Sequence, residues 1–167
     1  MLSPKVAIFL SGPIGTGKST LGIMLAQVLN GIFVEGDEHT NPNKPWYACT
    51  LSTARSIVRS VLASTTIDRP VIIAYPLRCI DWLFYRRHLA EYNIRVVVVS
   101  LTASHYAITS PARGREFSDS EQARISEMMV QGYDRRPFSD FTLRTDGGNK
   151  AETLALLLAG LSRALEG

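Results

Sequence analysis

Gly12-Pro13-Ile14-Gly15-Thr16-Gly17-Lys18-Ser19-Thr20 is the stretch that decides the fold of this chain. It follows an apolar run at residues 6–10 and opens a segment at 21–29 whose apolar residues recur with helical spacing. The order is therefore strand, glycine-rich turn and helix, and the letters fit the pattern G-x-x-x-x-G-K-[ST] of a phosphate-binding P-loop. An ordinary glycine-rich turn is the alternative, and the complete motif in the right context argues against it.

Each residue type in this loop has a physical task. The three glycines allow backbone conformations that a Cβ atom would penalise, so that successive N–H groups turn inward as an anion-binding nest. The helix that begins near Lys18 adds the positive end of its dipole. The Lys18 ammonium can reach the outer phosphates, and the Ser19 hydroxyl can ligate Mg²⁺. The predicted nucleotide-binding residues are Gly12, Gly15, Thr16, Gly17, Lys18, Ser19 and Thr20.

The composition is that of a globular domain. The chain has 167 residues, 46% of them hydrophobic and 20% charged, which predicts a single domain over residues 1–167 with a sizeable core. Its net charge of +3 is a mild bias towards anionic ligands. No apolar run reaches the ~20 residues of a membrane span, and no signal peptide precedes the first strand, so a cytoplasmic location is expected. Cys49 and Cys79 lack metal-site spacing and are expected to be free thiols.

Strands and helices alternate along the rest of the chain. Apolar runs predict five strands, at residues 5–10, 32–35, 71–74, 94–101 and 141–144. Helical periodicity predicts helices at 18–30, 46–63, 80–92, 118–133 and 150–165, with Gly31 ending the first, and a short helical piece at 103–109. This alternation gives right-handed crossovers and a parallel sheet covered on both faces. The expected class is α/β, a three-layer fold with a five-stranded parallel sheet flanked by helices, and the loop around 110–118 is the candidate lid.

At this point the chain resembles the small P-loop kinases, which include gluconate, shikimate and nucleoside monophosphate kinases. Gluconate kinases carry a second strand ending F-x-[ED]-G-D-x-x-H, and here that piece is Phe33-Val34-Glu35-Gly36-Asp37-Glu38-His39. Pro45-Trp46-Tyr47 is similar to their P-W-L helix start, and Arg113-Gly114-Arg115-Glu116-Phe117 to their R-x-G-x-F lid. The resemblance implies a P-loop kinase fold, ATP as phosphate donor and Mg²⁺ as cofactor.

The departures from these families concern the acceptor. Gluconate kinases have a longer segment between the two matching pieces, which encloses the sugar acid, where this chain has only Thr40-Asn41-Pro42-Asn43-Lys44. Shikimate kinases place two acids one residue apart, as Glu35 and Asp37 do, but their glycine triplet is replaced by Tyr75-Pro76-Leu77. Polynucleotide kinases and phage hydroxymethyluracil DNA kinases share the P-loop; the polynucleotide kinases also share an acid after the second strand and lid arginines.

Asp37 is the candidate catalytic base. It comes just after the second strand, at the edge of the sheet where open α/β proteins build their sites. A carboxylate there can accept the acceptor's hydroxyl proton or hold Mg²⁺ through water, so the predicted metal residues are Ser19 and Asp37. A turn or capping aspartate is the alternative. Glu35 is the weaker candidate, with a structural role as the competing interpretation.

Arginines supply the remaining candidates. Arg113 and Arg115 of the lid can grip phosphate and stabilise the charge in transit, so the predicted catalytic set is Asp37, Lys18, Arg113 and Arg115. A solvated charged loop is the alternative for the lid pair. Asp37, His39 and Arg78 are the predicted acceptor-binding residues. Trp46, Tyr47 and Tyr75 either stack on a ligand or pack in the core. The nucleotide base is expected near residues 146–149.

The sequence therefore predicts an ATP-dependent kinase that phosphorylates a hydroxyl group. Two acceptors compete: a hydroxyl on a nucleotide or DNA, and a small polyol or sugar acid as in gluconate kinases. The short segment after Asp37 and the arginine content favour the nucleotide or DNA narrowly. A nucleotide-binding regulatory protein without transfer activity is the alternative from another class.

Overall fold

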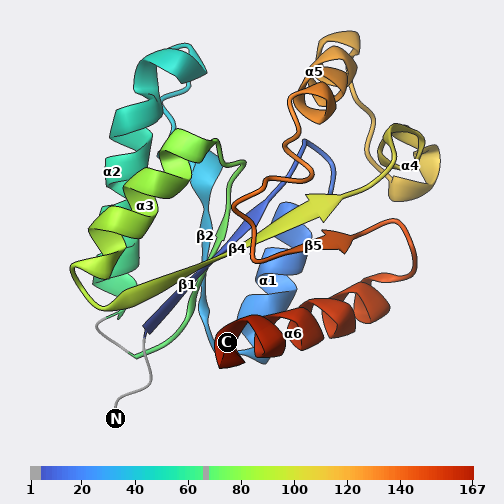
Figure 1. Cartoon of the computed structure of the whole chain (residues 1–167). Coiled ribbons are helices and arrows are strands. Elements are labelled where there is room, and N and C mark those ends of the chain that lie inside the picture. Colours follow the sequence, from blue (N-terminus) through green and yellow to red (C-terminus); the bar gives the residue numbers. More distant parts are fainter. Residues whose placement is uncertain (1–4, 66–67) are drawn as a thin grey trace.

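The computed structural model describes residues 5–65 and 68–167, and its centre is a five-stranded parallel sheet in the order β2-β3-β1-β4-β5. Figure 1 shows the sheet between two layers of helices, which confirms the predicted three-layer α/β class. The strands are β1 (Lys5–Ser11), β2 (Ile32–Glu35), β3 (Val71–Ala74), β4 (Ile94–Thr102) and β5 (Phe141–Arg144).

Helices cover both faces of the sheet, because alternate strand residues point to opposite sides. Ala7 and Phe9 of β1 pack with α2 and α3 on one face, whereas Ile8 and Leu10 pack with α1 and α6 on the other. The helices are α1 (Lys18–Val28), α2 (Trp46–Thr65), α3 (Cys79–Ala90), α4 (His105–Thr109), α5 (Asp119–Val130) and α6 (Lys150–Glu166), with two 3₁₀ turns, η1 (Gly36–His39) and η2 (Pro111–Arg113).

The strand order fixes which loops meet. β3 lies between β1 and β2, so the loop after β1 and the turn after β2 flank the same edge of the sheet. The backbone after β3 is tied to β1 there, since Tyr75 N donates to Leu10 O at 3.1 Å and Leu77 N to Ser11 Oγ at 2.8 Å. The P-loop and η1 are therefore held on one rigid support.

Several helix ends differ from the sequence prediction by two or three residues, and a backbone turn explains two of them. The first helix ends at Val28, and Asn30 rather than Gly31 takes the left-handed conformation beyond it, with φ 49°. Gly31 N then donates to Ala26 O at 2.7 Å, which satisfies a carbonyl of the last turn. The helix predicted to reach residue 133 ends at Val130, because Gly132 turns the chain with φ 71°.

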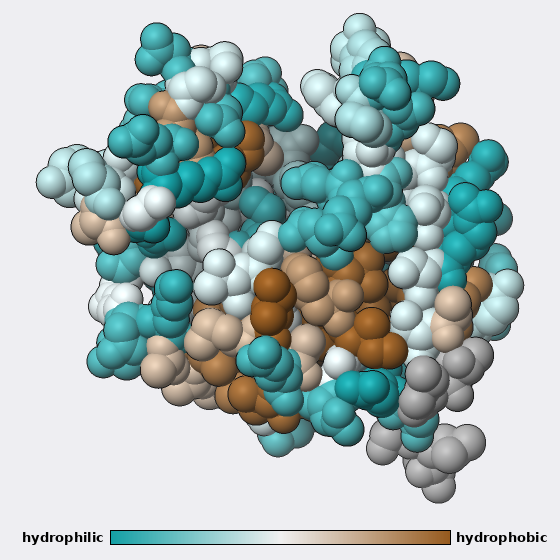
Figure 2. All heavy atoms as spheres, turned by 180° about the vertical axis from the view of Figure 1, so that it is seen from behind, coloured by the Kyte–Doolittle hydropathy of each residue, from teal (hydrophilic) through white to brown (hydrophobic). Residues whose placement is uncertain are grey.

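The ends of the elements on the side of the P-loop form two projections. One carries η1 and the start of α2, and the other carries α4 and α5 (Figure 1). The space-filling view from behind shows a notch between two upper projections, with apolar side chains gathered lower on that face (Figure 2). Among the helices in the described part of the chain, none has the length and apolar character needed to cross a membrane.

Candidate active site

The P-loop has the shape that its glycines predict. Gly15 and Gly17 adopt φ values of 81° and 94°, in the left-handed region that side chains other than glycine rarely occupy. A Cβ atom on Gly12 would lie 2.6 Å from Leu101 O, so this glycine allows the loop to approach β4. Thr16 Oγ1 donates to Pro13 O at 2.8 Å and closes the loop from inside. The result is a preformed concave backbone at the start of α1.

Lys18 lies inside this loop. Its Nζ donates to Gly12 O at 2.9 Å and to Pro13 O at 2.7 Å. Burial lowers the pKa of Lys18 to about 8, while the nearby carboxylates of Asp37 and Glu35 oppose that shift. The ammonium therefore lies near the position for outer phosphates and is easier to deprotonate than an exposed lysine.

Ser19 contacts Glu35 rather than Asp37. The Ser19 hydroxyl donates a hydrogen bond to Glu35 Oε2, which joins the first turn of α1 to the end of β2. A hydroxyl oxygen beside a carboxylate suits the oxygen-ligand preference of Mg²⁺. The sequence analysis predicts Ser19 and Asp37 as the metal residues and treats Glu35 as the weaker candidate. The contact between Ser19 and Glu35 is therefore visible only in the structure. Within residues 5–65 and 68–167, no cluster of three or more His, Cys, Asp or Glu side chains forms a ready-made metal site.

Two cavities meet at Asp37. The larger, of about 1120 Å³, is lined by the P-loop, the lid and the end of the sheet, and includes Lys18, Ser19 and Arg113. The smaller, of about 330 Å³, lies between the start of α2, the loop after β3, and α5. Asp37 lines both, and no other described residue does. Its carboxylate makes no hydrogen bond or ion pair with the described part of the chain, which argues against a capping role.

The lid rests directly on the P-loop. Arg113 donates through Nη1 to Gly15 O at 3.0 Å and through Nη2 to Thr145 O at 3.2 Å, so it bridges the two sides of the larger cavity. Arg115 also lines this cavity, is paired with Glu121 at 3.3 Å, and lies 4.6 Å from the centre of the Phe117 ring. Both predicted lid arginines therefore reach the larger cavity.

The predicted region for the nucleotide base also belongs to the larger cavity. Asp146, Gly148 and Asn149 line it opposite the P-loop. Arg144 and the backbone N–H of Ser104 both donate to the Asp146 carboxylate, and these bonds lower its pKa to about 2. The carboxylate stays ionised and fixes the loop between β5 and α6 to the start of α4.

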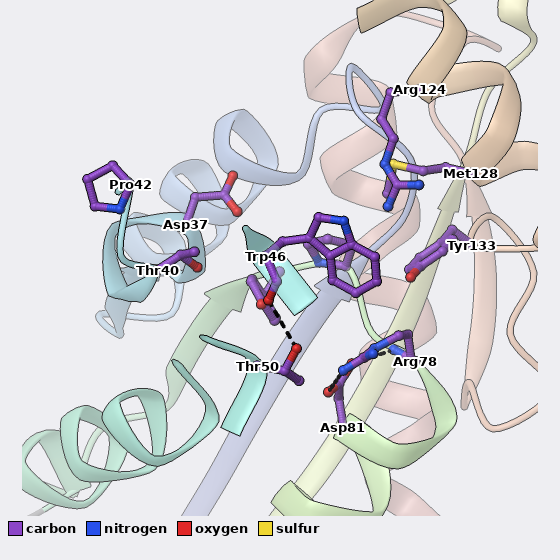
Figure 3. Close-up of a pocket in the computed structure, with 12 residues that line it drawn as sticks. Asp37, Thr40, Pro42, Trp46, Thr50, Arg78, Asp81, Arg124, Met128 and Tyr133 are labelled. Atoms are coloured by element: carbon purple, nitrogen blue, oxygen red, sulfur yellow. Dashed lines mark hydrogen bonds and ion pairs between the residues drawn. The ribbon is translucent and has the colours of Figure 1, made fainter. Parts of the chain in front are cut away.

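The predicted acceptor-binding residues separate in the structure. Arg78 lines the smaller cavity, where Figure 3 shows it beside Asp81. Its Nη2 and Nε lie 2.9 Å from the two Asp81 oxygens. His39, by contrast, turns towards α2, where its Nδ1 lies 2.7 Å from Ser56 Oγ, and it lines neither cavity.

Several lining residues of the smaller cavity were missed from the sequence. The sequence leaves stacking on a ligand and core packing open for Trp46 and Tyr75, and the structure places both on the cavity wall. The missed residues are Thr50 of α2, Asp81 of α3 and, from α5 and the turn after it, Arg124, Met128 and Tyr133. Only the apolar spacing of α5 marks this helix in the sequence, and that pattern does not show which of its polar residues faces a cavity.

Comparison with known proteins agrees with this geometry. No family model matches the chain. Over 156 residues it is 27% identical to the shikimate kinase of Vibrio parahaemolyticus, which covers 87% of this chain and 90% of that protein. It is 24% identical over 155 residues to the shikimate kinase of Buchnera aphidicola, with the same coverage.

Solved structures share the fold. A gluconokinase from Sinorhizobium meliloti superposes with a TM-score of 0.73 at 19% identity, over 99% of this chain and 96% of the other. An APS kinase from Mycobacterium tuberculosis gives 0.68 at 15% identity, over 95% and 98%. A shikimate kinase from Bacteroides thetaiotaomicron gives 0.59 at 19%, over 94% and 98%. The fold is that of the small P-loop kinases. The chain is a phosphotransferase with a hydroxyl group as acceptor.

Proposed function

We propose that this protein transfers the γ-phosphate of ATP to a hydroxyl group of a small molecule bound in the smaller cavity. The observation that carries the proposal is the position of Asp37, whose side chain lines both cavities. A base for phosphoryl transfer must reach the acceptor hydroxyl while the donor phosphate lies on the other side. The Asp37 carboxylate has no hydrogen bond or ion pair with residues 5–65 and 68–167, so it is available to an acceptor and meets that requirement.

The chemistry assigns a role to each residue. Asp37 takes the proton of the acceptor hydroxyl as its oxygen bonds to the γ-phosphorus, and the bond from that phosphorus to the bridging oxygen of ADP breaks. Lys18, Arg113 and Arg115 carry the positive charge that stabilises the transferring group. Ser19 and Glu35 would hold Mg²⁺, which neutralises phosphate charge when bound. This arrangement favours Glu35 over Asp37 at the metal and leaves Asp37 to act as base.

Size and relatives favour a small acceptor. The smaller cavity, of about 330 Å³, is at the lower end of the roughly 300–1,000 Å³ typical of small-molecule sites. The two relatives reported above that match in sequence are both named shikimate kinase, after a small-molecule acceptor. The narrow preference for a nucleotide or DNA rested on a short loop and on arginine content. The structure pairs Arg78 and Arg124 with acids of the chain itself, which weakens that argument.

A transfer assay with labelled γ-phosphate tests the proposal. The panel should contain shikimate, gluconate, other small hydroxyl compounds, nucleosides and 5′-hydroxyl oligonucleotides. We expect a small-molecule acceptor to be labelled, and Asp37→Asn to lower kcat by about 100-fold or more, because it removes the base. ATP affinity should stay within about threefold of the unmodified protein, since Asp37 does not form the P-loop.

Glu38→Gln is the matched control, because Glu38 is the exposed neighbour that lines neither cavity. It should leave kcat unchanged. If the Asp37→Asn protein transferred phosphate as fast as the unmodified protein, Asp37 could not be the catalytic base. Labelling of oligonucleotides alone, with a steep loss as salt rises, would replace the small-molecule acceptor with a nucleic acid.

A further inference from the structure

Trp46 is the most prominent side chain of the smaller cavity. It is the first residue of α2, and 53% of its surface is exposed although it is a large aromatic residue. Figure 3 shows the indole projecting into the cavity between the side chains of Arg124 and Arg78. The Arg78 and Arg124 Cζ atoms lie 5.4 Å and 5.7 Å from the centre of its ring. These cation–π contacts hold the indole in place while leaving much of it accessible.

The two arginines carry little free charge into the cavity. Arg78 is paired with Asp81, whose carboxylate is buried. Arg124 Nη1 lies 2.7 Å from Glu127 Oε2 on the next turn of α5. Asp37 adds a negative charge to the same wall. An acceptor recognised mainly through several negative charges would therefore find arginines that are already paired.

Most of the remaining wall is aromatic or apolar. Its uncharged polar side chains besides tyrosine are the hydroxyls of Thr40 and Thr50, and Thr50 Oγ1 already donates to Trp46 O at 3.1 Å. Besides Asp37 and the tyrosine hydroxyls, an open-chain polyol would find few uncommitted hydrogen-bond partners here, and each hydroxyl group left unpaired is costly on desolvation. A flat ring would instead cover the indole and its neighbours. Those neighbours are Pro42, Tyr75, Pro76, Met128 and Tyr133.

We propose that the acceptor is a planar, unsaturated ring compound that carries the reacting hydroxyl, and that Trp46 selects it by stacking. The proposal rests on the proposed function for the role of the cavity, and it specifies the class of molecule that fills it. Trp46 is a specificity-determining residue here and takes no part in moving the proton. Aromatic rings stack favourably on indole beyond the effect of buried area alone, which distinguishes them from saturated rings.

A matched pair of compounds isolates the planar ring. 4-(Hydroxymethyl)benzoate and trans-4-(hydroxymethyl)cyclohexanecarboxylate share the hydroxymethyl and carboxylate groups and differ in the unsaturation of the ring. The Trp82→Phe protein leaves Trp46 as its one tryptophan, because the chain contains two, and Phe preserves the stacking of residue 82 on Phe138. We expect saturable quenching of Trp46 fluorescence by the benzoate, with a Kd about three- to tenfold below that of the cyclohexane compound.

Calorimetric titration of the benzoate into three variants tests the assignment to Trp46. Trp46→Leu should weaken binding by about tenfold, and Trp46→Phe should recover part of the loss. Leu51→Ala is the control, because Leu51 is on the same helix, is 51% exposed and does not line the cavity. It should bind like the unmodified protein. Unchanged ATP affinity and circular dichroism would show that the variants fold.

Equal affinity for the two compounds, tighter binding of gluconate than of either, or no effect of Trp46→Leu would each overturn the proposal. So would the absence of saturable quenching up to the solubility of the benzoate. None of these results involves phosphate transfer, so the kinase assignment would survive them. Conversely, binding of the benzoate without transfer to any acceptor would leave the stacking site in place and remove the proposed function.

Discussion

At the scale of single residues, Lys18 links phosphate binding to pH. Its pKa in the free protein is lowered to about 8, whereas bound phosphates stabilise the ammonium and raise that pKa. Well below pH 8, Lys18 is already protonated in the free protein, so ATP binding takes up no proton there. Above pH 8, Lys18 is mostly neutral in the free protein and must take up a proton when ATP binds. We expect the Kd for ATP, measured by calorimetry, to rise on the order of tenfold between pH 7.5 and 9.5.

The Lys18→Met variant is the control for this titration. This variant should bind ATP weakly at both pH 7.5 and pH 9.5, and its Kd should not rise between them, because it lacks the titrating group. A pH-independent Kd in the unmodified protein would show that Lys18 keeps its proton throughout this range.

Glu35 gives a second prediction at this scale. Its carboxylate accepts the Ser19 hydroxyl and fixes the oxygen that would face Mg²⁺. Glu35→Gln keeps the shape and removes the charge, so the Mg²⁺ concentration for half-maximal transfer should rise about tenfold or more. Glu38→Gln should leave the Mg²⁺ dependence unaltered. If Glu35→Gln behaves like Glu38→Gln, the carboxylate is structural only.

The contrast between Lys18 and Glu35 shows what sequence reveals about single residues. The proposed phosphate-binding roles depend on local sequence, because the P-loop residues are contiguous and their spacing specifies the backbone. The Ser19–Glu35 contact depends on β2 lying two strands from β1, which no local pattern encodes. Arg124 is harder still, because an arginine on an amphipathic helix looks alike whether it faces a cavity or water. Likewise, His39 follows the strand end in sequence but turns to Ser56.

At the scale of elements, the lid and the P-loop pack as one unit. A Cβ atom on Gly15 would lie 2.6 Å from Ile108 Cγ2 and 3.0 Å from Phe117 Cζ, so Gly15→Ala should push α4 and the lid away. It also places a side chain at φ 81°, which costs about 1 kcal/mol on its own. We expect a rise in the KM for ATP of about tenfold or more, measured by steady-state transfer.

Gly132→Ala is the control that separates the backbone strain of a positive φ from the displacement of the lid. Gly132 also has a positive φ, of 71°, but nothing lies within 4 Å of the position of its Cβ. It should lose similar stability and keep its KM for ATP. Equal KM values for the two variants would mean that the lid does not depend on its contact with Gly15.

Strands and helices were predictable at this scale, and their ends were less so. Apolar runs place all five strands within a residue of their observed bounds, because a buried parallel strand needs an unbroken apolar stretch. The end of α1 depends on whether Asn30 or Gly31 takes the left-handed position, and both residue types are suited to it. In the folded chain Asn30 takes the left-handed position, and the hydrogen bond from Gly31 N to Ala26 O closes the helix end.

At the scale of the whole molecule, stability rests mainly on two large cores, one on each face of the sheet, with a smaller third cluster around Ile108 and Ile125. Leu157 of α6 is fully buried in one of them, whereas its neighbour Leu156 is 60% exposed. Leu157→Ala should lower the free energy of unfolding by about 3 kcal/mol, and Leu156→Ala by less than about 0.5 kcal/mol. Urea denaturation followed by circular dichroism measures both, and similar losses would contradict the assigned core.

The fold class followed from the order of the elements, whereas the smaller cavity could not be predicted from the sequence. A strand, P-loop and helix, followed by alternating strands and helices, admit few topologies. The smaller cavity is assembled from residues of η1, α2, α3, α5 and the loops beside them, which lie far apart in the chain. The shape of this cavity arises only in the folded molecule. The short segment after Asp37 and the arginine content of the sequence could not predict it.

The segment between β2 and α2 has a consequence for how such an enzyme changes its substrate. Residues 41–48, which lead into α2 and form its first turn, are all exposed, yet Pro42 and Trp46 line the smaller cavity, the proposed acceptor site. Exposed connections of this kind tolerate insertion and replacement with little effect on folding. Evolution could therefore change the sequence of this connection while the P-loop stays the same. A library of variants randomised at these residues would test new acceptors on an otherwise unchanged protein.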